Sequence, residues 1–553
     1  MFKRLLISFI TLVLVSCGGG NGTTTSSNGT VTPSSSTPTN STPIASSYSL
    51  GGSVTSATGI SPTGLVLTDG IDNITIAGSA STFTFPTSMS SSTAYTVSVK
   101  TNPGGVNCTI TNGTGSGTIS TSNVNSVTVN CAAGTVSALY TFKTGTNNTT
   151  GSANPNDGAF PQSVLVMDSL GNLYGTTVYG GGTAGAGTVF KLTPNSSGSY
   201  TESVLYRFQS SSNTDGASPQ AGLVMDSSGN LYGTTYGGGT ANKGTVFKLT
   251  LNPSSGSYTE TVLYSFQSGV NTTVVGNSND GANPYAGLVM DSLGNLYGTT
   301  NFGGTAGAGT VFKLTLNPSS GSYTESVLYS FQSGVNTTVT TTSNDGASPL
   351  AGLVMDSSGN LYGTTYGGGT ANKGTVFKLT LNPSSGSYTE TVLANGSTTY
   401  GANPVAGLIM DSLGNLYGTT YFGGTAGAGT VFKLTNNSGV YTESVIYSFQ
   451  SGVNTTVVGN SNDGANPYAG LVMDSLGNLY GTTFRGGNAN VGTVFKLTLN
   501  TSSSSYTESI LANGSTTYGA NPVAGLIMDS LGNLYGTTYF GGTANAGTVF
   551  KIN

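Results

Sequence analysis

The sequence predicts an all-β protein: a seven-bladed β-propeller whose last blade is completed by an N-terminal strand, preceded by a small β-sandwich. Two observations lead to this prediction. A unit of 55 to 65 residues recurs seven times, and it contains four strand-like segments, which is the content of one propeller blade. In addition, a spare strand-like segment precedes the first copy, whereas the last copy lacks its fourth segment.

Residues 1–16 have the pattern of a signal peptide. Lys3 and Arg4 precede an apolar run that is too short to span a bilayer. The run ends in Leu-Val-Ser before Cys17, which resembles a bacterial lipobox. This resemblance implies cleavage before Cys17 and acyl chains on it that insert into a membrane; the alternative is an ordinary secretory peptide. Because Gly18 resembles the residue of outer-membrane lipoproteins, we expect a lipid-anchored protein of the bacterial cell envelope, at the outer membrane or cell surface.

The next two segments differ sharply in composition. Residues 17–47 are mostly Gly, Ser, Thr, Asn and Pro, and so they bury too little surface to fold and are expected to form a flexible tether. Residues 48–133 contain seven short alternating segments, which predict a small immunoglobulin-like β-sandwich. This segment contains Cys108 and Cys131, and we predict a disulfide between them because the chain has an export signal. Two free thiols are the alternative.

The ends of the repeat region, residues 134–553, predict how it closes. Residues 134–142 are similar to the fourth strand of a unit, although no complete unit precedes them. The chain ends at residues 551–553, directly after the third strand of the seventh unit. We therefore predict that the early strand completes the last blade, which leaves no exposed sheet edge. A linear β-solenoid is the alternative, but it explains neither the long period nor the spare strand.

Every unit contains the turn Asp-Ser-x-Gly-Asn between its first two strands. This is a hairpin signal, because Asp bonds its own backbone and Gly adopts positive φ. The turn aspartates are Asp168, Asp226, Asp291, Asp356, Asp411, Asp474 and Asp529. We expect them to cap the turns. The alternative is calcium binding, for which one Asp and one Asn per loop supply too few oxygens.

The repeated motif Gly-Leu-Val-Met-Asp-Ser-x-Gly-Asn-Leu-Tyr-Gly-Thr-Thr, followed by Gly-Thr-Val-Phe-Lys-Leu, resembles the GloVer-type extracellular tandem repeat of bacterial surface proteins. The resemblance covers residues 134–553. More loosely, the motif is similar to that of NHL-like propellers, whose blades also place an Asp-x-x-Gly-Asn turn between two strands. The GloVer resemblance implies a tandem-repeat surface protein and brings no activity with it.

The charged residues exclude several classes of function. The chain has no His, which excludes Ser-His-Asp triads and the usual zinc sites. Only 6% of the residues are charged and the net charge is −5, which argues against nucleic acid as a partner. Six glutamates recur on the fourth strand, where we expect their charge to discourage edge pairing: Glu202, Glu260, Glu325, Glu390, Glu443 and Glu508.

The loops between the second and third strands contain the candidate ligand-binding residues. In an antiparallel blade these loops emerge at the same end as the connections between blades. The candidates are Tyr179, Tyr236, Phe302, Tyr366, Tyr421, Phe422, Phe484, Arg485, Tyr539 and Phe540, with Tyr285 and Tyr468 from the other loops. Aromatic rings among Asn, Thr and Ser can stack on sugars or bind a peptide. The alternative role is packing between blades.

These observations favour a non-catalytic, lipid-anchored surface protein that acts as an interaction or structural module and binds a polysaccharide or protein. No catalytic residue and no cofactor is assigned, because equivalent carboxylates lack the unequal environments that acid–base catalysis requires. The alternative function is a glycan-active or lactonase-like propeller enzyme. It would need a non-repeated group of carboxylates near the central axis, which the sequence does not contain.

Overall fold

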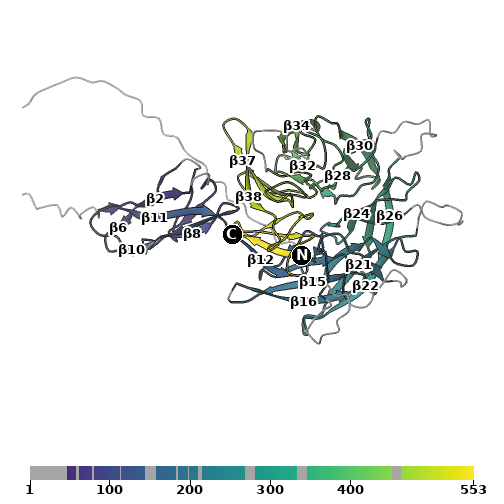
Figure 1. Cartoon of the computed structure of the whole chain (residues 1–553), viewed down its shortest axis with the longest axis horizontal. Helices are drawn as coiled ribbons and strands as arrows, with labels where there is room; N and C mark the ends of the chain where they lie inside the picture. The colour runs from purple at the N-terminus through teal and green to yellow at the C-terminus, as the bar shows by residue number, and fades with distance from the viewer. Residues whose placement is uncertain are drawn as a thin grey trace, which may run out of the picture. The chain divides into compact units, whose positions relative to one another are not determined.

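The structure is a computed structural model that describes most of the chain after residue 45. The described residues are 46–57, 61–77, 80–111, 114–143, 157–181, 185–196, 198–209, 215–267, 280–332, 345–450 and 463–553. Contacts divide the chain into residues 1–46 and 47–553. All described secondary structure lies in the second unit and consists of strands (Figure 1). None of the described residues forms a helix that could cross a lipid bilayer.

Residues 47–133 form eleven short strands where the sequence predicted seven. They make a four-stranded sheet, β5-β2-β11-β9, a three-stranded sheet, β4-β3-β8, and two small pairs, β1-β6 and β10-β7. The strands are β1 (Ser47–Tyr48), β2 (Leu50–Ser56), β3 (Val66–Thr68), β4 (Asn73–Thr75), β5 (Thr82–Thr84), β6 (Met89–Ser90), β7 (Ala94–Thr96), β8 (Ser98–Thr101), β9 (Val106–Ile110), β10 (Ser116–Thr118) and β11 (Val124–Ala133). The β2–β11 pair is parallel.

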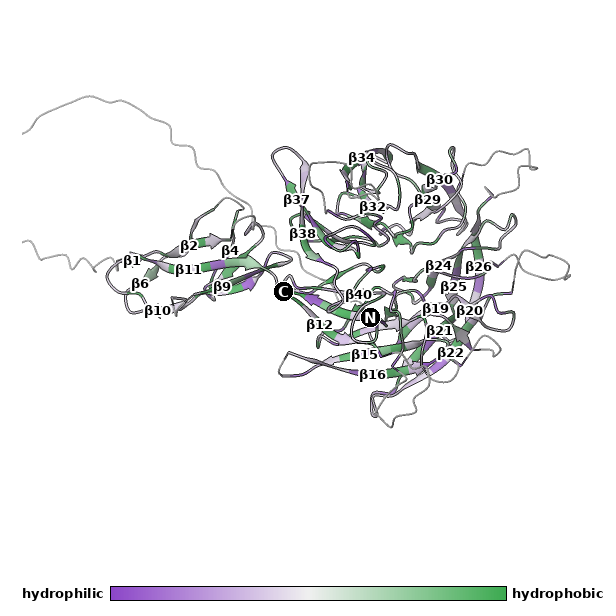
Figure 2. Cartoon of the chain, viewed as in Figure 1, coloured by the Kyte–Doolittle hydropathy of each residue, from purple (hydrophilic) through white to green (hydrophobic). Residues whose placement is uncertain are grey.

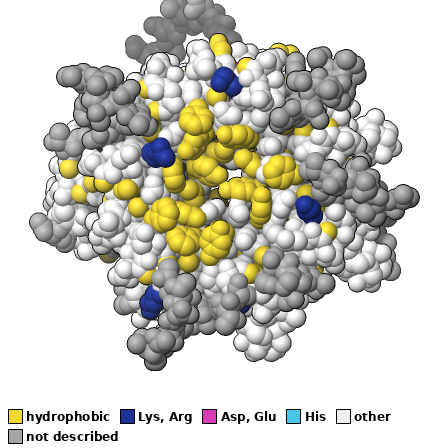
Figure 3. Space-filling model, turned by 45° about the vertical axis from the view of Figure 1, so that its right-hand side comes forward, with side chains coloured by type: hydrophobic (Ala, Val, Ile, Leu, Met, Phe, Trp, Pro, Cys, Tyr) yellow, Lys and Arg dark blue, Asp and Glu magenta, His cyan; other side chains and the backbone are white. Residues whose placement is uncertain are grey.

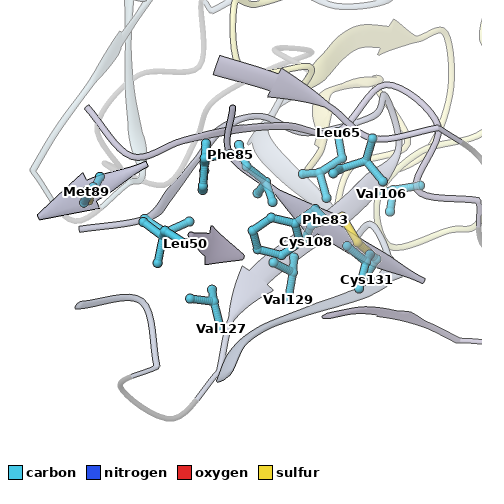
Figure 4. Close-up of a cluster of buried hydrophobic side chains, with 14 of the residues drawn as sticks. Leu50, Leu65, Phe83, Phe85, Met89, Val106, Cys108, Val127, Val129 and Cys131 are labelled. Carbon is cyan, nitrogen blue, oxygen red and sulfur yellow. A yellow bond between two sulfur atoms is a disulfide. The ribbon is translucent and has the colours of Figure 1, made fainter. Parts of the chain in front are cut away.

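A single hydrophobic core fills this segment (Figure 4). Leu50, Val127 and Val129 are fully buried, because every second residue of a strand faces the same side. The structure contains the predicted disulfide between Cys108 and Cys131, which lie directly opposite each other on β9 and β11. It therefore links the neighbouring strands β9 and β11 at the edge of the core.

The repeat region forms seven four-stranded antiparallel sheets, six of which follow chain order. The first is β13 (Val166–Met167), β14 (Leu173–Thr177), β15 (Thr188–Pro194), β16 (Tyr200–Arg207); the second is β18 (Val224–Met225), β19 (Leu231–Thr235), β21 (Thr245–Leu251), β22 (Tyr258–Ser265); the third is β23 (Val289–Met290), β24 (Leu296–Thr300), β25 (Thr310–Leu316), β26 (Tyr323–Ser330). The fourth is β27 (Val354–Met355), β28 (Leu361–Thr365), β29 (Thr375–Leu381), β30 (Tyr388–Asn395); the fifth is β31 (Ile409–Met410), β32 (Leu416–Thr420), β33 (Thr430–Asn437), β34 (Val440–Ser448); the sixth is β35 (Val472–Met473), β36 (Leu479–Thr483), β37 (Thr493–Asn500), β38 (Ser505–Asn513). A further two-stranded pair joins β17 (Gly216–Ala217) to β20 (Gly237–Gly238).

The seventh sheet takes its fourth strand from the beginning of the repeat region. It contains β39 (Ile527–Met528), β40 (Leu534–Thr538) and β41 (Thr548–Ile552), and β12 (Val136–Thr141) pairs with β41. The pairing is antiparallel, with Val136 opposite Ile552 and Thr141 opposite Thr548. The strand pairing expected for the two ends of the region is therefore present, and the sheets are arranged in a propeller-like manner.

Each sheet is buried on both sides in its second and third strands, because neighbouring sheets pack against it. Hydrophobic residues accordingly lie along these strands (Figure 2). Val189 and Phe190 in β15 are fully buried, and one core cluster contains Val189 of the first sheet with Leu231 of the second. Within the first sheet, Gly175 of β14 leaves room for the ring of Phe190 opposite it on β15, since a Cβ on Gly175 would lie 2.7 Å from that ring.

A phenylalanine after the fourth strand packs edge-to-face on the third-strand phenylalanine of the next sheet, with ring centroids 5.1 or 5.2 Å apart. The pairs are Phe142–Phe190, Phe208–Phe247, Phe266–Phe312, Phe331–Phe377 and Phe449–Phe495. At the other two junctions Gly396 and Gly514 replace the first phenylalanine. They keep its backbone hydrogen bond, which Gly396 N–H donates to the Gly374 carbonyl at 2.8 Å. These two junctions therefore lack the ring contact.

Two kinds of hydrogen bond connect successive sheets, and both also connect the seventh sheet to the first. The Thr176 hydroxyl donates to the Ala221 carbonyl of the second sheet at 3.0 Å, and Thr537 donates to the Ser163 carbonyl at 3.3 Å. Ser218 N–H donates to the Ala186 carbonyl at 2.8 Å, and Phe160 N–H donates to the Ala546 carbonyl at 2.7 Å. The contacts between the last and first sheets thus repeat those between consecutive sheets.

The role of β12 can be tested with Phe142→Ala. Phe142 is fully buried against Phe190, and removing such a ring costs about 3–5 kcal/mol. We expect a lower denaturation midpoint in guanidinium chloride, followed by tyrosine fluorescence. Phe208→Ala is the matched control, because Phe208 makes the same contact one sheet later. A large loss for the control with none for Phe142→Ala would show that β12 does not stabilise the seventh sheet.

Candidate functional site: the aromatic face

The loops between second and third strands lie beside the connections that enter the first strands. Single bridges join Ala159 to Tyr179, Ala282 to Phe302 and Ala402 to Phe422, and equivalent bridges occur in further sheets. We call the surface formed by these two sets of loops the aromatic face. The twelve candidate residues all belong to these loops.

The candidate residues divide by exposure. Tyr179 is 50% exposed, Phe422 44%, Phe302 39% and Tyr366 37%, and Arg485 is also exposed. The other seven, Tyr236, Tyr285, Tyr421, Tyr468, Phe484, Tyr539 and Phe540, are partly buried. Figure 3 shows hydrophobic side chains gathered around a central hollow on one face of the molecule.

Two tyrosines from separate sheets meet near the centre of this face. Tyr285 precedes the third sheet and Tyr468 precedes the sixth, and their hydroxyl oxygens lie 3.0 Å apart. Burial, followed by the proximity of Tyr468, raises the pKa of Tyr285 far above its usual value. Both hydroxyls therefore stay neutral and the pair forms a fixed polar bridge.

A hollow of about 280 Å³ lies beside this bridge. It is lined by Gln162, Tyr285, Tyr421, Tyr468, Phe484, Val523, Tyr539 and Phe540. These residues come from the loops of the third, fifth, sixth, seventh and first sheets, whereas the loops of the second and fourth sheets contribute none to this lining. The seven near-copies therefore produce an asymmetric site, which the sequence repeats did not predict.

Sequence reasoning missed three residues here: Phe160, Gln162 and Val523. Phe160 packs on Tyr539 with a centroid distance of 4.9 Å and on Tyr179 at 6.0 Å. Its φ of 58° lies in the left-handed region, which is unusual for a bulky residue. The other six copies have Ser or Asn at this position. That departure from the repeat was the signal that could have identified it.

A narrower hollow of about 120 Å³ continues from the Tyr285–Tyr468 bridge between the first strands. It is lined largely by small residues, including Ala286, Gly352 and Gly407. Neither this hollow nor the aromatic one has a described Asp or Glu in its lining. Those linings therefore offer no carboxylate for acid–base chemistry.

Five aspartates in the connections that enter the sheets accept hydrogen bonds from neighbouring tyrosines. In five connections between sheets, the Asp of Asp-Gly-Ala accepts a hydrogen bond from the tyrosine at the end of the preceding fourth strand. Tyr264 donates to Asp280 at 2.7 Å, and Gln267 N–H donates to the same carboxylate at 2.9 Å. The equivalent tyrosine–aspartate pairs are Tyr140–Asp157, Tyr206–Asp215, Tyr329–Asp345 and Tyr447–Asp463. Each carboxylate therefore joins the end of one fourth strand to the residues that enter the next sheet.

The turn aspartates lie in the hairpins between the first and second strands. In the first copy, Asp168 Oδ1 accepts the Leu170 and Asn172 N–H groups, each at 2.9 Å. Its Oδ2 accepts the Asn172 side-chain amide at 2.7 Å and the Tyr174 hydroxyl at 3.0 Å. Burial alone would raise the pKa of Asp168, but these hydrogen bonds lower it below the usual value. The other six copies repeat the hydrogen bond from the asparagine side chain to the aspartate.

This geometry suits turn capping, since each carboxylate oxygen already accepts two hydrogen bonds. A calcium ion needs six to eight oxygens, and it would have to displace these donors. Within the described residues, no three His, Cys, Asp or Glu side chains come together in a way that could hold a metal ion.

The repeated glutamates are less solvated than their outer-strand position suggested. Glu260, Glu325 and Glu390 are partly buried, and each has one buried oxygen that no described residue hydrogen-bonds. Burial, and then the charge of a neighbouring aspartate, raises the pKa of each to about 7. A fully exposed charge would discourage edge pairing, but here part of the carboxylate faces protein. The adjacent sheet, which the sequence pattern does not show, causes this burial.

Comparisons with known proteins match the repeats. A family model described as the Gloeobacter/Verrucomicrobia repeat matches residues 112–339, 316–454 and 445–553. No curated protein matches the chain.

Two solved structures resemble it in part. One is a putative 6-phosphogluconolactonase from Bacteroides uniformis ATCC 8492, with a TM-score of 0.41 and 13% identity over 64% of this chain and 85% of that one. The other is a protein of unknown function from Dyadobacter fermentans DSM 18053, with a TM-score of 0.34 and 11% identity over 71% of this chain and 94% of that one.

The glutamates predict a pH-dependent stability. The folded-state pKa of Glu260 is about 7, above the ordinary 4.5, so the folded protein binds the proton more tightly than the unfolded chain. The associated stability is present below about pH 4.5 and is lost as pH rises through 7. We therefore expect Glu260→Gln with Glu325→Gln to raise the melting temperature at pH 8 and leave it unchanged at pH 4.

Asp291→Asn is the control of opposite sign. The pKa of Asp291 is lowered, because its hydrogen bonds outweigh burial, and its contribution is therefore present at pH 8 and lost in acid. This variant should melt at a lower temperature at pH 8. An equal shift of the glutamine variant at both pH values would contradict the assigned burial of the glutamates.

Proposed function

The chain belongs to the Gloeobacter/Verrucomicrobia repeat family, and on that premise we propose that it is a non-catalytic binding module whose aromatic face binds a glycan. The observation that carries the proposal is the hollow lined by six aromatic residues, including the Tyr285–Tyr468 bridge, together with Gln162 and Val523. Flat rings beside amide and hydroxyl groups suit a sugar, because its C–H faces stack on rings while its hydroxyls accept and donate hydrogen bonds.

We also infer that the seven sheets form a closed seven-bladed propeller. Support comes from the pairing of β12 with β41 and from the Thr537–Ser163 and Phe160–Ala546 hydrogen bonds. Closure gives every sheet two neighbours and leaves no exposed edge at the ends of the repeat array. It also brings loops from the first and seventh sheets to the same hollow, as the binding site requires.

A non-catalytic role is proposed because the hollow has a lining without carboxylates among its described residues. The aspartates nearest the aromatic face already accept hydrogen bonds from tyrosines and the backbone. An acid–base pair needs two carboxylates of different pKa at one reacting bond. The repeated aspartates are instead equivalent members of the supporting structure.

Cys17 lies outside the described residues, and we propose from its sequence setting that it is lipidated. Acyl chains on Cys17 and residues 17–47 as tether would hold the binding face away from the membrane. The protein would then act in the bacterial cell envelope, at the outer membrane or cell surface. There it would link that membrane to a polysaccharide.

The binding proposal predicts that Tyr421→Ala with Tyr539→Ala removes glycan binding, because both rings line the hollow. A glycan array probed with the wild-type chain should identify ligands, and the variant should bind them at least about tenfold more weakly. Leu413→Ala is the control, since Leu413 is an exposed apolar residue in the turn of the fifth sheet. Absence of any glycan ligand, or equal loss for both variants, would contradict the proposal.

Lipidation predicts that Cys17→Ala abolishes membrane attachment. When the full gene is expressed in a bacterial host, wild type should sediment with membranes and incorporate radiolabelled palmitate. The variant should incorporate no palmitate, because the thiol that receives the lipid is missing. Cys108→Ala serves as the control for cysteine loss, and palmitate in the Cys17→Ala protein would exclude a lipid on this residue.

A further inference from the structure

We propose that the ligand of the aromatic face is an anionic polysaccharide with carboxylates on its sugar units. This inference rests on the proposed glycan-binding function and specifies its substrate class. It assigns two roles to the face: the hollow receives a sugar ring, and basic residues around it pair with the carboxylates of the polymer.

The charge of the face supports an anionic ligand. Lys243 and Lys373 occupy the same position in the loops of the second and fourth sheets, where four other copies have Ala and one has Val. Both lysines are partly buried, and their carbonyls accept the Asn283 and Asn403 N–H groups, each at 2.7 Å, so the two copies hold the lysine backbone in the same way. On the visible described surface, Figure 3 shows basic side chains around the hydrophobic centre and no acidic one.

Arg485 connects this charge to the hollow. It belongs to the loop of the sixth sheet and is exposed, and its guanidinium lies 5.9 Å from the centroid of the Phe484 ring. Because Phe484 lines the hollow, a sugar ring seated there would place its substituents near this cation. A guanidinium binds a carboxylate through two parallel hydrogen bonds, which suits a uronic acid.

The acidic residues of the same loops do not cancel this charge at the surface. Asp157, Asp280, Asp345 and Asp463 are buried and Asp215 is partly buried, and each of the five accepts a hydrogen bond from a tyrosine. The exposed charge beside the hollow is therefore the guanidinium of Arg485, although the whole chain has a net charge of −5. Local charge, rather than the net charge, decides which ligand approaches this face.

The spacing of the basic residues favours a polysaccharide over a nucleic acid. Lys243, Lys373 and Arg485 belong to the second, fourth and sixth sheets, so the face carries few, separated cations around stacked rings. Nucleic acids need many phosphate contacts for strong binding. A polymer with one carboxylate per sugar fits such a face, because its sugar rings can contact the aromatic rings while its carboxylates pair with the few basic side chains.

The test uses the whole chain and two polymers that differ only in charge. Polygalacturonate carries a carboxylate on each sugar, and its fully methyl-esterified form has the same backbone without charge. By calorimetry at low salt, we expect polygalacturonate to bind more tightly, and binding to weaken with added salt. The triple variant Lys243→Gln, Lys373→Gln, Arg485→Gln should bind it roughly tenfold more weakly.

Lys100→Gln is the matched control, because Lys100 is exposed on β8, outside the repeat region, and it should leave binding unchanged. Equal affinity for both polymers, with loss only in the Tyr421→Ala, Tyr539→Ala variant, would overturn the anionic inference and leave the glycan function intact. No binding of either polymer would overturn the anionic inference, while the glycan array separately tests the binding function. Tighter binding of poly-glutamate or single-stranded DNA than of polygalacturonate would also overturn it.

Discussion

The repeat region depends on burial between neighbouring sheets, and at five of its seven junctions this burial includes a phenylalanine of one sheet packed against the third-strand phenylalanine of the next. Each four-stranded sheet is too thin to bury its own apolar side chains, and burial of both faces therefore requires neighbours. Glycines such as Gly175 let the rings lie close to the adjacent strand.

This packing explains why the polar and exposed side chains lie in the turns and loops at the two ends of the sheets. The sides of the second and third strands are occupied by neighbouring sheets, so that exposed side chains gather in the turns and in the loops. The turn aspartates are saturated by hydrogen bonds such as those from Asn172 and Tyr174 to Asp168. The aromatic loops instead present rings, and this difference between the ends makes the aromatic face the candidate for recognition.

Much of the fold could be predicted from local patterns. The strands, the Asp-Ser-x-Gly-Asn hairpins and the partner of the early strand all follow from short segments and from what is missing at the chain's end. The site was harder to predict. The Tyr285–Tyr468 contact joins residues 183 positions apart, and no local signal encodes such a distance. Phe160 departs visibly from the repeat, but only the packed structure shows that it supports Tyr539. The burial of the glutamates likewise depends on an adjacent sheet.

Because Gly396 and Gly514 replace phenylalanine at two junctions, neighbouring sheets pack less tightly there than at the other five junctions. Both glycines keep the backbone hydrogen bond of the missing residue, as Gly514 does with the Gly492 carbonyl at 2.8 Å, but neither supplies a ring. The two junctions without the ring contact lie between the fourth and fifth sheets and between the sixth and seventh sheets. They therefore separate the fifth and sixth sheets from the other five. We therefore expect motion between sheets to be largest at these two junctions, with the fifth and sixth sheets moving together relative to the other five. Tyr421 and Phe484 belong to the fifth and sixth sheets, whereas Gln162 and Tyr539 belong to the group of five sheets. A relative motion of the two groups would therefore change the width of the hollow that these residues line.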